Sequence, residues 1–371
     1  EFRRTHKQAL SGVLKQCARL CMKLDLIAGN VLFLDGTKIR ANAGRDATHT
    51  KAWYEQQLSA VDQRIADLLD QCEKQDSAEK ELGSFVKTDA ELGKTEKLKQ
   101  KIETALQEIK ATDKSKMNST DPECAIIHSI QGSHASYNAQ MVVDDKHSLI
   151  VHADSVSDCN DRNQFAHQIN QANQVLEKSC TVACADAGYA NTDELEKIDD
   201  QGIAVIVPSQ RQAQRSDEGP FSKSCFTYDH EQDCYYCPEG NRLTYRSTYK
   251  KNGKCTYKIE KASLCRSCSH FGQCTRSREG RKVVRLKNEA VKQRLEAHYQ
   301  QPSSQQIYAR RKASVEHPFG HIKRNLRVGA FLLRGLAGVR AEMSMFASCF
   351  NIARMTKLLG ATPLIHALRA L

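Results

Sequence analysis

The sequence lacks several features that define whole classes of protein. No stretch approaches the roughly 20 consecutive apolar residues of a membrane span, and no secretory signal peptide stands at its start. Only one tryptophan, Trp53, occurs in 371 residues. The first residue is not methionine, so we expect residue 1 to lie inside a longer parent chain. These absences argue against a membrane protein or a secreted one.

Cysteine and positive charge, in contrast, are abundant. The chain has 15 cysteines, an odd number, which without a secretory signal argues against a disulfide framework and for reduced thiols in the cytoplasm. It has 55 lysines and arginines against 44 acidic residues, a net charge of +11. Such an excess favours a polyanionic partner, nucleic acid first, although a solvated basic surface has the same composition.

Strand-like runs and helix-like periodicity alternate along much of the chain. Residues 4–27 have helical spacing, and residues 31–35 form an apolar run ending in Asp-Gly, which predicts a buried strand followed by a turn. Residues 136–153 alternate like two paired strands. The other expected elements are a helix starting near Asp161, strands at 181–186 and 203–207, a helix at 192–200 and helices from 286 onward. This alternation predicts an α/β sheet.

Two segments depart from that alternation. Residues 51–116 repeat apolar side chains every three or four positions in two runs, which predicts an antiparallel helical hairpin. The runs are Leu58, Val61, Ile65, Leu68 and Cys72, then Leu98, Ile102, Ala105, Leu106 and Ile109. Trp53 stands at the start and is expected to be a packing anchor. Residues 209–285 are polar and rich in cysteine and tyrosine, with little periodicity.

Two aspartates end apolar, strand-like runs. Asp35 ends the run 31–35, and Asp186 ends the run 181–186. Strand ends hold side chains rigidly, and adjacent strands would place the two carboxylates side by side. An aspartate close to a glycine is also a common turn residue, so each one alone fits a structural role.

A glutamate far downstream is the third candidate. Because proline is tolerated only in the first turn of a helix, Pro318 predicts a helix that starts near residue 315, with Glu316 at its mouth. Lys323 and Arg327 follow at seven and eleven residues, so all three are expected on one helical face. Further positive charge stands just upstream, at Arg310, Arg311 and Lys312. A first-turn acid that stabilises the helix dipole is the alternative for Glu316.

Three such carboxylates suit phosphodiester chemistry. Two Mg²⁺ ions about 3.5–4 Å apart can activate an attacking oxygen and stabilise a leaving one. Mg²⁺ prefers hard oxygen ligands and keeps several waters, so a few carboxylates suffice. Asp35, Asp186 and Glu316 are therefore the candidate metal ligands and catalytic residues of a DNA-cleaving site.

The cysteine-rich segment contains two C-x₂-C pairs. Cys234 and Cys237 form the first pair and Cys265 and Cys268 the second, with 27 residues between them. Four thiolates at such spacing predict structural Zn²⁺, which would crosslink a segment too polar to build its own core. Cys274 could take the place of Cys268, and His270 is a weaker substitute. A redox dithiol or unliganded cysteines are the alternatives. Interleaved basic residues and tyrosines indicate contact with DNA or a merely soluble surface.

Together these features resemble bacterial insertion-sequence transposases of the DDE type, whose catalytic domain is ribonuclease H-like. The resemblance covers roughly residues 25 to 358 and rests on four stretches in order. They are Leu34-Asp35-Gly36-Thr37, Tyr137-Asn138-Ala139-Gln140, Ala185-Asp186-Ala187-Gly188-Tyr189 and Glu316-His317-Pro318-Phe319-Gly320 with Lys323. The family also has an arginine four residues before its glutamate, and this chain has Lys312 at that position. The family has a tyrosine three residues before that arginine, and Tyr308 lies one residue further upstream than this spacing predicts.

The resemblance implies roles for these residues. Asp35, Asp186 and Glu316 would hold two Mg²⁺ or Mn²⁺ ions. Water would cleave at the element end, and the freed 3′-hydroxyl would attack target DNA. The expected DNA-binding residues are Lys323, Arg327, Lys312 and Arg311. The implied partners are element-end DNA, target DNA and a second copy of the chain in a homodimer, and the implied location is the cytoplasm of a bacterium, at the nucleoid.

The resemblance also implies a domain plan: an α/β fold in which helices flank a ribonuclease H-like mixed sheet. The core would comprise 28–50, 117–208 and 286–360, with the hairpin 51–116 and a zinc-ribbon-like segment 209–285 as insertions. Residues 1–27 would be a residual N-terminal helix. We therefore expect the family's separate N-terminal DNA-binding domain to be missing or reduced to that helix.

Two other functions fit the same residues. A nuclease of the same superfamily would hydrolyse DNA with the same carboxylates but would not join strands. A transposase remnant without catalytic activity would bind DNA and leave it intact.

Overall fold

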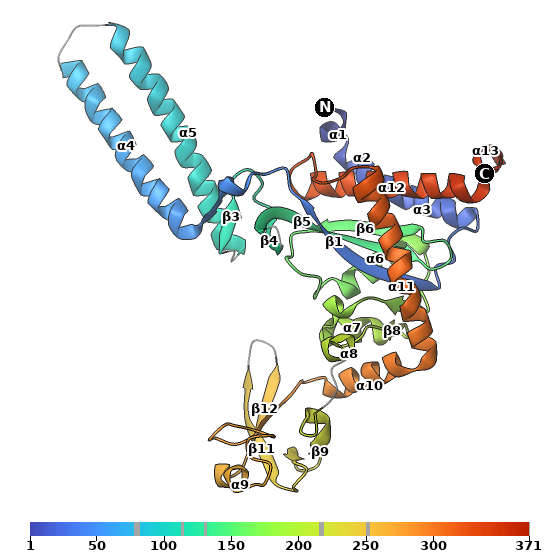
Figure 1. Ribbon diagram of the computed structural model, residues 1–371. Helices are drawn as coiled ribbons and strands as arrows, with labels where there is room; N and C mark the ends of the chain where they lie inside the picture. The colour runs from blue at the N-terminus through green and yellow to red at the C-terminus, as the bar shows by residue number, and fades with distance from the viewer. Residues whose placement is uncertain (78–81, 113–114, 130–131, 215–218, 250–252, 371) are drawn as a thin grey trace. The chain divides into compact units, whose positions relative to one another are not determined.

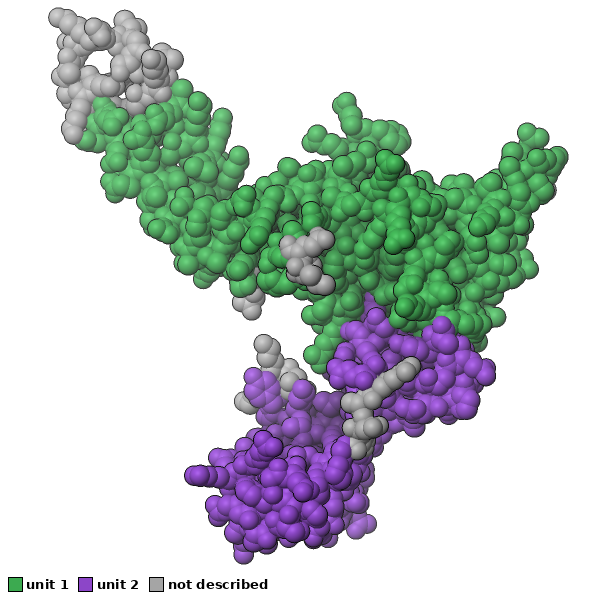
Figure 2. Space-filling view, viewed as in Figure 1, with its two compact units in different colours: residues 1–184, 310–371 green, residues 185–309 purple. Residues whose placement is uncertain are grey.

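The computed structural model describes residues 1–77, 82–112, 115–129, 132–214, 219–249 and 253–370 (Figure 1). These residues form a mixed α/β protein with two compact units, coloured separately in Figure 2. Unit 1 comprises residues 1–184 and 310–371, and unit 2 comprises residues 185–309. None of the helices within the described ranges has the length and hydropathy that a membrane crossing needs.

A mixed sheet forms the centre of unit 1. Its strands run in the order β4-β5-β1-β7, and β6 also pairs with β5. The pairs are antiparallel except for β7, which is parallel to β1. The strand bounds are β1 (Val31–Arg40), β4 (Ala125–Ser129), β5 (Gly132–Asp144), β6 (Ile150–Val156) and β7 (Val182–Cys184). The predicted paired strands of 136–153 and the predicted strand of 181–186 are thereby confirmed.

Strand β1 is twice as long as the sequence predicted. The expected turn at Asp35-Gly36 is wrong, because β1 continues through both residues to Arg40. Strand β5 pairs with β1 without interruption, from Leu32↔Asp144 to Arg40↔Ser136. This ladder of backbone hydrogen bonds outweighs the local turn preference of Asp-Gly. Asp35 therefore lies in the middle of a strand.

Helices cover the sheet of unit 1. Helix α6 (Phe165–Leu176) packs on β1, β5 and β6, and α12 (Leu336–Leu359) packs on β6. The expected single helix of residues 4–27 is wrong: the chain forms three short helices, interrupted at His6 and Gly12. They are α1 (Phe2–Thr5), α2 (Lys7–Ser11) and α3 (Val13–Lys23), and all three contact α12. The terminal helix α13 (Ala361–Ala370) also contacts α12.

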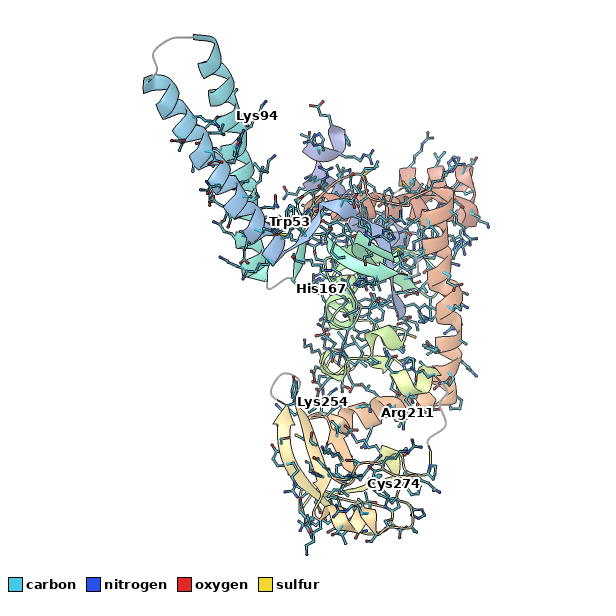
Figure 3. The ribbon with its side chains drawn as sticks, turned by 60° about the vertical axis from the view of Figure 1, so that its left-hand side comes forward. Trp53, Lys94, His167, Arg211, Lys254 and Cys274 are labelled. Atoms are coloured by element: carbon cyan, nitrogen blue, oxygen red, sulfur yellow. The ribbon has the colours of Figure 1, made fainter. Side chains whose placement is uncertain are left out.

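The predicted helical hairpin is present. Helices α4 (Lys51–Ser77) and α5 (Leu82–Thr112) pack against each other and project from strands β2 (Thr48–Thr50) and β3 (Lys116–Asn118), which pair at their base (Figure 1). Trp53, labelled in Figure 3, packs against the hairpin's apolar cluster and stacks on His49 at 3.5 Å between ring centroids. Its predicted role as a packing anchor is confirmed.

Unit 2 contains a second, antiparallel sheet. Its strands run in the order β13-β12-β11-β10-β9, around a small cluster of buried side chains. Their bounds are β9 (Thr227–Asp229), β10 (Cys234–Tyr236), β11 (Arg242–Tyr249), β12 (Lys254–Ile259) and β13 (Lys282–Arg285). The remaining elements are η2 (Ala187–Tyr189), α7 (Thr192–Asp199), β8 (Ala204–Ile206), α8 (Gln210–Gln214), η3 (Lys223–Cys225), α9 (Ala262–Arg266) and α10 (Glu289–Gln300).

The helix that carries Glu316 starts earlier than expected. Helix α11 (Pro302–Gly320) begins at Pro302, and Pro318 lies inside its last turn. The predicted start near residue 315 is therefore wrong, because the first-turn proline is Pro302 and not Pro318. The chain continues as the π-helical turn η4 (His321–Asn325). Because Pro318 has no N–H, the α-helical hydrogen bond that would run back to the Ser314 carbonyl is missing near the end of α11.

One buried amide makes a specific prediction about this fold. The Asn351 side chain on α12 accepts a hydrogen bond from the Ile150 N–H at 2.9 Å and donates one to the Ile150 carbonyl at 2.8 Å. Both residues are fully buried. Asn351→Ala leaves two backbone groups of β6 without partners, so we expect the free energy of unfolding to fall by about 2–3 kcal/mol.

Chemical denaturation of the full chain measures this loss, with Ile352→Ala as the matched control. Ile352 is the next residue on α12 but is 52% exposed. Its substitution should change the stability by less than about 0.5 kcal/mol. Equal effects of the two substitutions would contradict the assigned packing of α12 on β6.

Candidate active site

Asp35 lies at the centre of the candidate site in unit 1. Its side chain is 22% exposed, and one carboxylate oxygen accepts a hydrogen bond from the Gly36 N–H at 2.8 Å. Its neighbour across the sheet is Met141 of β5, a fully buried residue. The pairing with β5 thus fixes the backbone before and after Asp35, which restricts where its carboxylate can lie.

Helix α11 brings a cation to this carboxylate. The Arg311 guanidinium lies 3.3 Å from the Asp35 carboxylate, and only 12% of the Arg311 side chain is exposed. The preceding Arg310 instead pairs with Asp145 at 2.7 Å. Arg311, predicted from sequence as a DNA-binding residue, is therefore in direct electrostatic contact with the candidate catalytic aspartate.

Glu316 lies on an exposed part of the same helix. Its side chain is 64% exposed, and its closest cation is Lys312, at 3.8 Å and 76% exposed. A pair this exposed contributes little to stability. Both side chains can therefore reorient towards a ligand at small cost.

Lys323 approaches β1 from the π-helical turn. Its ammonium donates a hydrogen bond to the Thr37 hydroxyl, two residues after Asp35. Alternate residues of a strand share a face, so Arg311 and Lys323 approach the same face of β1. The Lys323 side chain is exposed overall, but partial burial of its ammonium lowers its pKa. Burial without an anionic partner disfavours the charged form of the Lys323 ammonium, and an anion beside it would favour that form again.

Glu316, Lys323 and Arg327 do not share one face of a regular helix. The α-helical pattern ends at Gly320, and the Leu326 N–H donates to the His321 carbonyl, a π-helical hydrogen bond. Arg327 follows with a left-handed φ of 54°. The predicted common face is wrong because a π turn advances the chain differently from the α-helix assumed for it.

A polar network occupies the other face of β1. The Asp161 carboxylate accepts hydrogen bonds from Asn138 and Gln140 of β5, both at 2.7 Å, and from the Lys38 ammonium at 3.2 Å. Asn138 and Gln140 belong to one of the stretches on which the family resemblance rests. Sequence reasoning missed Asp161, since no local pattern marks it; only the register of β1 with β5 assembles the network.

Other acids of unit 1 have structural partners. Asp121 accepts a hydrogen bond from the Tyr137 hydroxyl at 2.7 Å, and Asp154 forms an ion pair with Arg340 at 2.7 Å. Both carboxylates are almost fully buried. These contacts give both acids structural partners.

Asp186 belongs to unit 2. It caps the short helix η2: its carboxylate accepts a hydrogen bond from the Gly188 N–H at 2.7 Å. Tyr189, three residues on, is buried and anchors the segment. The turn role of Asp186 is thus real, and its membership of a metal site with Asp35 and Glu316 stays a prediction.

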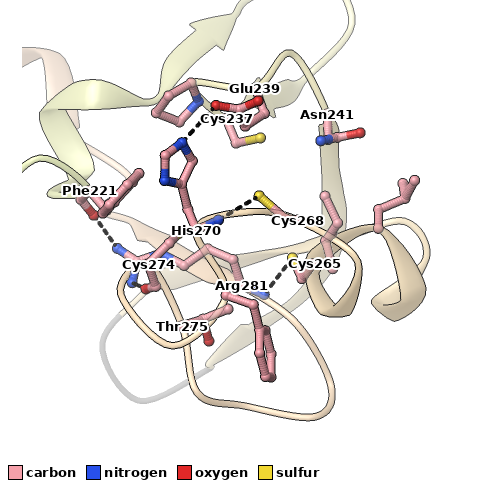
Figure 4. Close-up of a pocket in the computed structure, with 14 residues that line it drawn as sticks. Phe221, Cys237, Glu239, Asn241, Cys265, Cys268, His270, Cys274, Thr275 and Arg281 are labelled. Carbon is pink, nitrogen blue, oxygen red and sulfur yellow. Dashed lines mark hydrogen bonds and ion pairs between the residues drawn. The ribbon is translucent and has the colours of Figure 1, made fainter.

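The predicted zinc cysteines do not all lie together. Cys237, Cys265 and Cys268 line one pocket of unit 2 with Cys274 (Figure 4). Cys234 is fully buried in β10 and does not line it. Burial raises the pKa of the Cys274 thiol, nearby Arg281 lowers it, and the other three pocket cysteines raise it. Within the described residues, no three Cys, His, Asp or Glu side chains already converge as metal ligands do.

Comparison with known families supports the expected class. Residues 236–356 match the family model described as "Transposase DDE domain". The matched segment contains Glu316 and Lys323, whereas Asp35 and Asp186 precede it. This match supports a DDE transposase family, and with it an enzyme that acts on DNA. No curated protein and no solved structure gives a significant match.

The contact between Arg311 and Asp35 generates a prediction. If Asp35 is a metal ligand, the guanidinium at 3.3 Å competes with the cation. Exposed ion pairs contribute up to about 1 kcal/mol, and this one is mostly buried. We therefore expect Arg311→Met to tighten Mn²⁺ binding by about tenfold, equivalent to about 1.4 kcal/mol.

Electron paramagnetic resonance of free Mn²⁺ measures this affinity on the full chain. Arg310→Met is the matched control, since Arg310 pairs with Asp145 instead. It should leave the affinity unchanged. Weaker binding in Arg311→Met would mean that Arg311 supports the metal ligands rather than competing with the ion.

Proposed function

We propose that this chain is a DNA transposase that cleaves element ends and joins them to target DNA through Asp35, Asp186 and Glu316. The match of residues 236–356 to a transposase DDE domain carries the proposal, because the matched segment contains the predicted third carboxylate. DNA is the proposed partner, bound by a dimer that pairs two element ends, and the proposed location is the cytoplasm.

The strand order of unit 1 supports a ribonuclease H-like core. Strands β6, β5 and β1 form an antiparallel meander, and the chain then returns through α6 to β7, which is parallel to β1. Asp35 and Asp186 stand at equal spacings from a pair of residues that β1 and β7 align. Asp35 is two residues beyond Phe33, and Asp186 is two residues beyond Cys184, the residue that pairs with Phe33. This spacing supports the proposal that both carboxylates serve one centre.

The donor set fits Mg²⁺ or Mn²⁺. All three proposed ligands are carboxylates, the hard oxygen donors that these ions prefer, and the Asp35 carboxylate already lies against a cation. Two bound ions would activate the attacking oxygen and stabilise the leaving one. The chain's own contribution is to fix Asp35 within the sheet and to supply Glu316 from an exposed position on α11.

Basic residues beside the carboxylates would hold the phosphates. Lys323 lies at Thr37 with a partly desolvated ammonium, so a DNA phosphate would be a stronger partner than the neutral hydroxyl. Lys312 and Arg327 are exposed, so both side chains are accessible to a DNA backbone. These three residues, with Arg311, would position DNA rather than read its sequence.

Loss of any of the three carboxylates should abolish the chemistry. Asp35→Asn, Asp186→Asn and Glu316→Gln should each reduce nicking and joining of a labelled duplex with the parent element's ends to below about one-hundredth of wild type. Changes around metal ligands alone cost about 10- to 100-fold, so loss of a ligand costs at least that. The reaction should require Mg²⁺ or Mn²⁺.

Asp200→Asn is the matched control, because Asp200 is exposed at the end of α7 and should keep wild-type rates. Nicking without joined products would favour a nuclease of the same superfamily. Binding of DNA without any metal-dependent product would indicate a catalytically silent remnant and would refute the proposal.

Lys323 provides a separate test of DNA binding. Lys323→Ala should weaken DNA binding, and the slope of log affinity against log salt should fall by about 1, as for one lost phosphate contact. Thr37→Val is the control: it removes the hydroxyl partner but leaves the cation, so affinity and slope should be retained. Fluorescence anisotropy over a salt series measures both. An unchanged slope in Lys323→Ala would place Lys323 outside the DNA contact.

A further inference from the structure

Four cysteines of unit 2 surround one small cavity. Cys237 follows β10, Cys265 lies in α9, and Cys268 and Cys274 lie in the loop after it (Figure 4). The cavity they line has a volume of about 30 Å³, room for one small ion or water. None of these cysteines is in a disulfide. The site therefore has four reduced sulfurs around a space for a single ion.

Backbone donors point at two of the sulfurs. The His270 N–H donates to the Cys268 sulfur at 3.4 Å, and the Arg281 N–H donates to the Cys265 sulfur at 3.4 Å. The second contact depends on Gly280, which has a φ of +82° and where a Cβ would lie 2.4 Å from Ile259 and 3.3 Å from the Cys265 sulfur. Hydrogen bonds from the backbone favour the thiolate form of cysteine, the form that binds metal.

A fixed cation lies beside the cluster. The Arg281 guanidinium donates to the carbonyls of Cys274 at 2.9 Å and Phe221 at 2.8 Å. A tetrathiolate site with a divalent ion carries a net charge of −2, so this arginine would offset part of it. The His270 ring instead faces the Glu239 carboxylate at 3.1 Å, which makes it a poor candidate for a ligand.

Cys234 lies apart from this set because of strand geometry. Neighbouring residues of a strand face opposite sides of the sheet, and Tyr235 is part of the buried cluster against which Cys237, Cys265 and Cys274 pack. The Cys234 thiol lies instead beside Arg242, whose pKa it raises through a hydrogen bond. Cys234 therefore fits a structural position in β10.

The sheet around the cavity has little apolar core of its own. Six buried side chains form its cluster: Phe226, Tyr235, Leu243, Tyr257, Ile259 and Val283. A structural metal or disulfides commonly supplement apolar cores as small as this cluster. An ion shared by the four cysteines would crosslink the turn after β10 to α9 and to the loop that follows α9.

We propose that Cys237, Cys265, Cys268 and Cys274 bind one structural Zn²⁺ as four thiolates, with Cys234 outside the site. The thiols give up their protons to solvent as they bind. Among the described residues, the four sulfurs do not yet converge as the ligands of one ion do. A single side-chain torsion positions each cysteine sulfur, so binding at the roughly 2.3 Å zinc–sulfur distance would require rotation about these torsions. This proposal does not depend on the DNA chemistry.

Metal content of the purified full chain tests the ligand set. Wild type should contain one zinc per chain by plasma mass spectrometry. Serine substitution of Cys237, Cys265, Cys268 or Cys274 should reduce zinc to less than half of that. Cys234→Ser and Cys255→Ser should keep it, and both are matched controls from strands of the same sheet. Zinc-free wild type, or zinc loss in Cys234→Ser with retention in Cys274→Ser, would overturn the proposal.

Cobalt substitution keeps the test decisive if a serine variant fails to fold. The visible bands of Co²⁺ in the wild-type chain should be those of a tetrahedral tetrathiolate site. Cys274→His should shift them to shorter wavelength, as one nitrogen replaces one sulfur, and Cys234→His should leave them unchanged. A spectrum that responds to Cys234→His alone, or a Cys265–Cys268 disulfide in the purified chain, would refute the four-cysteine site.

Discussion

The pairing of β1 with β5 is the constraint on which unit 1 depends. It runs without interruption from Leu32 to Arg40 and leaves no freedom to the backbone at Asp35. It also places two different sets of polar contacts on opposite faces of β1. Asp35 and Thr37 face the cations of α11 and η4, whereas Lys38 faces the Asp161 network with Asn138 and Gln140. A register slip of one residue would exchange the two faces, so both sets of contacts oppose it.

The two charged groups on this face of β1 differ in how well they are paired. A partly buried carboxylate is costly unless it is paired, and Arg311 supplies the pair. Among the described residues, the neighbouring Lys323 has a neutral hydroxyl as its hydrogen-bond partner, and partial burial lowers its pKa. The face therefore holds one satisfied charge and one poorly satisfied charge. The proposed DNA and divalent cations would improve both, because a cation would replace the guanidinium at Asp35 and a phosphate would replace the hydroxyl at Lys323.

Sequence periodicity predicted several elements whose formation is local, and it failed where distant partners or two equivalent local signals decide. The hairpin of α4 and α5 and the paired strands β5 and β6 follow from apolar spacing alone. The turn at Asp35-Gly36 was wrong because β5, about 100 residues away, imposes a strand. The helix of Glu316 was misplaced because Pro302 and Pro318 both fit a helix start locally. Asp161 carries no local signal, since only the folded sheet gives it partners.

The same distinction applies to the cysteines. Two C-x₂-C pairs identify a metal-binding type of sequence, but the spacing does not show which side of a strand each sulfur faces. Strand β10 ends at Tyr236, so Cys237 lies in the turn that follows, while Cys234 keeps the alternation of the strand. Cys274 does not belong to a C-x₂-C pair. The loop that begins at Cys268 nevertheless places Cys274 in the cavity lined by Cys237, Cys265 and Cys268. In the proposed zinc site, the end of β10 therefore decides which cysteine can be a ligand. Strand alternation fixes the face of a sulfur only within the hydrogen-bonded strand, which includes Cys234 but not Cys237.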